Sequence, residues 1–90
     1  MDNPTNQHKT LGITTFAECG PDATPLLRVN PGIDVRHALE HSANLQHIAS
    51  QLMADSAMGD GGQHVPWAAV YLNEMAQAIV EDLALVRQDR

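Results

Sequence analysis

The sequence predicts a mainly α fold: an antiparallel helical hairpin with short N-terminal extended segments, which pairs with a second copy into a four-helix bundle. Two long stretches carry apolar residues at helical spacing, and a glycine-rich break separates them. The 90 residues are 43% hydrophobic but only 3% aromatic. A chain of this length forms one small domain with few large core side chains.

The N-terminal part of the chain divides into a tail and two short extended segments. Residues 1–10 are polar and include one proline and two asparagines, so we expect a disordered tail before a single domain over residues 11–90. Residues 11–16 and 26–29 are β-prone, and turn-forming residues separate them at Glu18–Pro25. Strands this short are not stable alone, so we expect them to lie against the helices.

The first helix is expected at about residues 34–58. Asp34 is a favourable N-cap residue after an Asn-Pro-Gly turn, and no proline or glycine follows before Gly59, which suits a left-handed C-cap. The pattern is amphipathic. One broad face carries Val35, Ala38, Leu39, Leu45, Ile48, Ala49, Leu52 and Met53.

The second helix is expected at about residues 65–88, with Pro66 in its first turn. Small and apolar neighbours widen its central stripe to about half of the circumference, and such a face requires more than one neighbour. The short connection makes the two helices antiparallel. The stripe consists of Ala68, Leu72, Met75, Ile79, Leu83 and Val86.

Histidines on the first helix raise the question of a metal site. His37 and His41 have the i, i+4 spacing that allows two imidazoles to reach one ion, and Glu40 and His47 lie nearby. His47 points away from that pair, so further ligands would have to come from elsewhere in the chain. We therefore expect a solvated helix face, with no metal ion and no cofactor.

Candidate nucleophiles lack the neighbours that would activate them. Cys19 lies beside Glu18, which disfavours a thiolate, and we expect a small buried residue under a loop. Ser42, Ser50 and Ser56 lie on or near the apolar side of the first helix, where small residues suit a helix crossing. The sequence therefore predicts no catalytic residues and no enzymatic activity.

The aromatic residues Trp67 and Tyr71 are one turn apart at the start of the second helix. Such a pair forms a shelf for a ligand, or covers a small core, or contributes to an interface with a partner. Core or interface is the preferred interpretation.

The charge balance argues against several classes of partner. Eleven acidic and five basic side chains give a net charge of -6, and the basic residues are scattered, so we expect no nucleic-acid or membrane binding. One cysteine and no signal-peptide or membrane-span pattern favour a cytoplasmic location.

Four segments resemble a family of small, uncharacterised bacterial proteins, chiefly from pseudomonads, that is known as a domain of unknown function. These segments are FxxCG, PLLRVNPG, ALEHSANL and PWAAVYLNEMAQAIVED, and together they span Phe16 to Asp82. The resemblance implies the domain boundaries and a bacterial origin, and it implies no catalytic residue. It depends on Phe16, Cys19, Gly20, Leu26, Leu27, Val29, Gly32, Ala38, Leu39, Ala43, Leu45, Trp67, Ala68 and Leu72.

The sequence favours a non-enzymatic protein-interaction or regulatory module that acts as a homodimer, with another protein as a further candidate partner. The alternative is a small-ligand or metal-binding protein that uses the histidine-bearing first helix or a pocket near Trp67. For the homodimer, the expected interface residues are Leu45, Leu52, Leu72, Met75 and Ile79.

Overall fold

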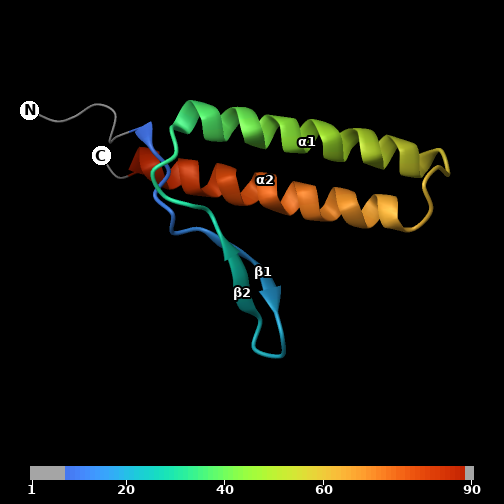
Figure 1. The fold of residues 1–90 in the computed structure, drawn as a ribbon, viewed down its shortest axis with the longest axis horizontal. Helices are drawn as coiled ribbons and strands as arrows, with labels where there is room; N and C mark the ends of the chain where they lie inside the picture. Colours follow the sequence, from blue (N-terminus) through green and yellow to red (C-terminus); the bar gives the residue numbers. More distant parts are fainter. Residues whose placement is uncertain (1–7, 89–90) are drawn as a thin grey trace, which may run out of the picture.

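The computed structural model describes residues 8–88 and contains two strands followed by two helices. The order is β1 (Thr15–Cys19), β2 (Thr24–Arg28), α1 (Val35–Ala57) and α2 (His64–Gln88). The helices lie side by side and antiparallel, and the two-stranded hairpin projects from α2 on the side away from α1 (Figure 1). The expected helical hairpin, preceded by extended segments, is confirmed.

Both helices begin and end within one residue of their expected bounds. At the start of α1, Asp34 Oδ1 accepts a hydrogen bond of 2.8 Å from the Arg36 backbone N–H, and this bond lowers the pKa of Asp34. The expected N-cap is therefore confirmed. After α1, Gly59 has φ = +85°, a left-handed conformation that glycine adopts without strain.

The two helices pack closely because small residues line their contact. Ser42 is buried, and its hydroxyl donates a 3.0 Å hydrogen bond across the contact to the carbonyl of Ala76, which has no exposed surface. The expected role of serine at a helix crossing is confirmed for Ser42, whereas Ser50 is exposed. The buried apolar side chains of the pair are Ala38, Leu45, Ala49, Ala69, Ala76, Ala78 and Leu83.

The strands lie closer together along the chain than expected, because the turn between them is shorter. Their antiparallel register pairs Phe16 with Leu27 and Cys19 with Thr24, so both strands extend into the predicted turn at Glu18–Pro25. Residues 11–14 were expected in the first strand but belong to neither strand. Their backbone N–H groups bind the Asp82 carboxylate instead of a neighbouring strand.

Ordered structure begins before the expected domain boundary at residue 11. Thr10 is buried, its backbone N–H donates a 2.8 Å bond to the Ile33 carbonyl, and its hydroxyl donates a 2.6 Å bond to the Asn30 carbonyl. The expected tail over residues 1–10 therefore extends too far, and its residues 1–7 lie outside the described part of the chain.

The molecule is flat, with principal extents of 56 × 32 × 16 Å. Since the helix pair is a single layer, each helix has one helical neighbour within the chain (Figure 1). Neither of the described helices is long and apolar enough to cross a membrane.

Candidate functional site

A buried carboxylate positions the base of the hairpin. Asp82 on α2 is fully buried and accepts four backbone hydrogen bonds from the segment Leu11–Thr14, which we call the strap. Oδ2 accepts from Leu11 at 2.8 Å and Gly12 at 3.3 Å. Oδ1 accepts from Ile13 at 3.1 Å and Thr14 at 3.2 Å. The strap is thereby held against α2.

Two opposing effects determine the charge of Asp82. Burial raises the pKa of this carboxyl group, and the four N–H donors lower it, leaving the pKa of Asp82 below its ordinary value. The group is therefore ionised at neutral pH. Four donors in fixed positions satisfy the buried charge, so the role of Asp82 is structural positioning of the strap.

A second carboxylate holds β1 against α2. Glu74 Oε2 accepts a 3.0 Å hydrogen bond from the backbone N–H of Ala17, whose φ of +61° is unusual for a residue other than glycine. This contact and the strap attach the hairpin to α2 at two points that are about two turns apart, since Glu74 and Asp82 are eight residues apart on it. The projecting hairpin is therefore fixed at its base.

Sequence reasoning missed the role of Asp82. The available signal was an acidic residue three positions after Ile79 and seven after Met75, on a side of the helix that is otherwise apolar. Gly12 was a second signal, because a glycine inside a β-prone segment often marks a bulge or a close approach of the backbone. Its φ is +78°, and an added Cβ would lie 2.6 Å from the Pro31 side chain.

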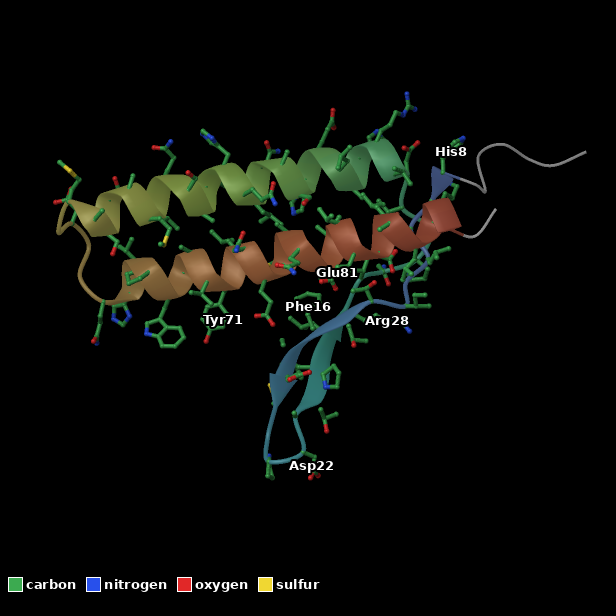
Figure 2. The ribbon with its side chains drawn as sticks, turned by 180° about the vertical axis from the view of Figure 1, so that it is seen from behind. His8, Phe16, Asp22, Arg28, Tyr71 and Glu81 are labelled. Carbon is green, nitrogen blue, oxygen red and sulfur yellow. The ribbon has the colours of Figure 1, made fainter. Side chains whose placement is uncertain are left out.

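The angle between the hairpin and the helices creates an apolar hollow of about 420 Å³. Phe16 and Arg28 line it from the base of the hairpin (Figure 2). His37 and His41 line it from α1, and Met75 lines it from α2. The hollow is open to solvent on one face of the helix pair, and this is the candidate functional site.

Three of the five expected interface residues, Leu45, Met75 and Ile79, line this hollow. Leu45 is already buried within the single chain, whereas Met75 keeps 36% of its surface exposed. Leu52 and Leu72 are half-buried and lie one heptad from Leu45 and Ile79, hence on the same side of their helices. The structure thus places all five on one face, which we call the hollow face.

The histidines of α1 are exposed, as expected for a solvated face. His37 and His41 lie at the wall of the hollow, while His47 does not. Within residues 8–88, no three His, Cys, Asp or Glu side chains are grouped closely enough to hold a metal ion.

The structure corrects the expectation for Cys19, which is exposed rather than buried under a loop. Cys19 ends β1, and the hairpin projects away from the helices, so no other element of residues 8–88 covers it (Figure 1). Its thiol donates a 3.3 Å hydrogen bond to the Ala17 carbonyl.

The aromatic pair lies at the other end of α2 from the strap. Trp67 and Tyr71 are each 61% exposed, and their ring centroids are 6.3 Å apart with a tilt of 34°. They do not cover a core within this chain. This exposure is contrary to the core-cover interpretation, and the ligand shelf and the interface with a partner remain as predictions.

Residues 10–86 match a protein family of unknown function, in agreement with the expected resemblance. The matched segment contains the strap, the hairpin, Asp82 and all of the hollow-lining residues named above. No curated protein and no solved structure is found to be similar to the chain. The chain belongs to the family described as "Protein of unknown function (DUF3077)".

Proposed function

We propose that this protein is a non-enzymatic interaction module that works as a homodimer, in which the hollow faces of two copies form a four-helix bundle. The observation that carries this proposal is the apolar hollow on a molecule one helix thick. Exposed apolar side chains continue from it along the same face. Ile48, for example, is exposed and lies two turns after His41 on α1.

The energetics of a single hairpin support a second copy. Ordering each residue costs about 1.5 kcal/mol, and one helix–helix contact made largely of alanine and serine offsets little of this cost. The 23 residues of α1 span about 35 Å at about 1.5 Å per residue. A face of this length buries more than ~2,000 Å² in a dimer, which is typical of obligate homodimers.

Sedimentation velocity at several protein concentrations, with circular dichroism, tests the dimer. On the hollow face, Ile48→Lys and Met75→Lys introduce a charge at exposed positions, and we expect both to abolish the dimer. The matched controls are Leu39→Lys and Val80→Lys, also exposed but about 200° and 140° around their helices from His41 and Met75. We expect both controls to remain dimeric.

Two results would contradict the proposal. A wild-type protein that sediments as a folded monomer at micromolar concentration would exclude the homodimer. Dissociation by the control substitutions, with the hollow-face variants still dimeric, would assign the interface to the opposite face. A hollow-face variant that unfolds as it dissociates supports an obligate dimer.

The hairpins remain available for another protein in this dimer. All five residues of β2 are exposed, including Leu26 and Leu27. A partner that copurifies with the wild type and is lost with Leu26→Glu, while the dimer persists, would identify this surface. Loss of the partner with Met75→Lys alone would place it on the hollow face instead.

A second candidate function is the binding of a small amphipathic anion in the hollow. Its volume falls in the range of about 300–1,000 Å³ found for ligand sites, and Arg28, His37 and His41 at its wall favour a negative group. Native mass spectrometry of the purified protein tests this function. A bound organic anion that is lost with Arg28→Gln but kept with Arg36→Gln would support it.

A further inference from the structure

We infer that the two copies pack antiparallel, so that Trp67 and Tyr71 of each copy fill the hollow of the other. This inference rests on the proposed homodimer and adds the orientation of the copies and the residues that enter the site. It starts from a feature of the single chain: an apolar hollow lies nearer one end of α2 and an exposed aromatic pair nearer the other, with Tyr71 one turn from Met75 on the same side of the helix.

The hydrogen bond between Ser42 and Ala76 fixes how the two helices are aligned. The hollow is centred close to this level, because His41, Leu45 and Met75 line it. Trp67 lies nine residues from Ala76 toward the loop between the helices, which is about 14 Å at about 1.5 Å per residue. The aromatic pair therefore lies beyond the hollow and outside it.

Two identical faces pack together about a two-fold axis that lies in the plane of their contact. If the axis runs parallel to the helices, each position along the helices meets the same position in the second copy, and each hollow faces another hollow. If the axis crosses the helices near Gln46, the centre of α1, the helices of the second copy run in the opposite direction. Trp67 of the second copy then lies over the hollow. The second arrangement fills both hollows with side chains that are otherwise exposed.

The direction of the side chains agrees with this arrangement. In Figure 2, Tyr71 extends from α2 on the side where the hairpin carries Phe16 and Arg28. An axis that crosses the helices leaves this direction unchanged, so both hairpins project to the same side of the dimer. The aromatic pair of one copy then meets the hairpin base of the other, where Phe16 forms part of the hollow.

A complementary polar pair, an imidazole N–H donor and a carboxylate acceptor, gives independent support. His37 and Asp55 are both exposed, and each lies nine residues from Gln46 along α1. They are 18 residues apart, which is five full turns at about 3.6 residues per turn, so both point to the same side of the helix. Because the second copy runs in the opposite direction, His37 of one copy lies opposite Asp55 of the other, and this pair forms twice in the dimer.

The amino-acid types suit the assigned roles. Tryptophan and tyrosine dominate the buried centres of protein interfaces, and each buries about 150–250 Å² when enclosed. Both side chains are 61% exposed in the single chain, so their transfer into an apolar hollow removes a large area from water.

Trp67 is the single tryptophan of the chain and provides a direct measurement. We expect its emission to shift to shorter wavelength, and its quenching by acrylamide to decrease several-fold, over the concentration range in which sedimentation detects the dimer. A dimer in which acrylamide quenches Trp67 as freely as in the monomer would overturn this inference but leave the homodimer intact. A protein that stays monomeric would contradict the proposed function itself.

A substitution pair tests the contribution of the aromatic residue. We expect Trp67→Ala to raise the dimer dissociation constant at least about tenfold. The matched control is Asn73→Ala, also exposed near the same end of α2 but about 120° around the helix from Trp67 and 160° from Met75, and we expect its dissociation constant to match that of the wild type. Equal effects of the two substitutions would contradict the inference.

A charge exchange tests the orientation without disturbing the core. In one chain His37→Glu places two acidic residues at the paired positions, and in the other Asp55→Lys removes the acidic residue and places a lysine there. The antiparallel dimer predicts that an equal mixture forms more heterodimer than the statistical half, measured by native mass spectrometry. A statistical mixture would overturn the assigned orientation.

Discussion

The carboxylate of Asp82 has no exposed surface and accepts all four N–H groups of the strap. Asp82→Asn replaces one accepting oxygen with an NH₂ group, which cannot accept, so at least two of the buried or part-buried N–H donors lose their partner. We expect the free energy of unfolding to fall by about 3 kcal/mol in urea denaturation at fixed protein concentration. The control Glu81→Gln lies on the exposed side of the same helix. It should change the free energy of unfolding by less than about 0.5 kcal/mol.

The lowered pKa of Asp82 also makes stability depend on pH. A carboxyl group whose folded-state pKa is below its unfolded value contributes full stability above the unfolded value, which is 3.8 here. This contribution is lost as the pH falls through the folded-state pKa. We expect the wild type to lose stability below about pH 4 more steeply than Asp82→Asn. Parallel curves for the two proteins would show that Asp82 does not carry this dependence.

Gly12 in the strap combines a positive φ with a close neighbour. Gly12→Ala introduces a Cβ at 2.6 Å from Pro31 and adds strain at φ = +78°. Gly20→Ala is the matched control, because its φ of +76° is similar but its Cβ would have no neighbour within 4 Å. We expect thermal unfolding to show a clearly larger loss for Gly12→Ala. Equal losses would mean that Pro31 moves aside.

The contact between α1 and α2 depends on the small size of its residues. Ala76→Leu adds three carbon atoms at a position without exposed surface and pushes Ser42 away from the Ala76 carbonyl. We expect a loss of about 1–3 kcal/mol in the free energy of unfolding. Ala84→Leu, at an exposed position of the same helix, should be nearly neutral, and a similar loss there would indicate an effect on helix propensity instead.

The helices were predictable because their signals are local. Asp34, Gly59 and the apolar spacing between them are sufficient to fix the bounds of α1. The strands were displaced by a few residues, because the β-prone strap forms its hydrogen bonds with Asp82, about 70 positions later in the chain. No local pattern records that partner.

The candidate site was predictable in part for the same reason. Helical spacing alone brought Leu45, Met75 and Ile79 to one face. The hollow itself depends on where Phe16 and Arg28 of the hairpin meet the helices, and this is fixed by the contacts of Glu74 and Asp82. The pattern could therefore indicate an apolar face but not its shape.

At the scale of the whole molecule, the flat outline separates three surfaces. The hollow face is concave and largely apolar, the opposite face carries scattered apolar residues such as Leu39 and Val80, and the hairpin extends beyond both. A dimer through the hollow face leaves the other two surfaces accessible. In the proposed dimer, these two surfaces would be the ones that another protein could contact.

The attachment of the strap to Asp82 also predicts an order of folding. These hydrogen bonds join residues 68 to 71 positions apart, whereas the helices form from neighbours in the chain. Closing so long a loop is slow, so we expect the helical hairpin to form first and the strap to close after the rate-limiting step. In stopped-flow experiments Asp82→Asn should then accelerate unfolding and leave the refolding rate unchanged. A slower refolding rate would instead place the strap in the folding nucleus.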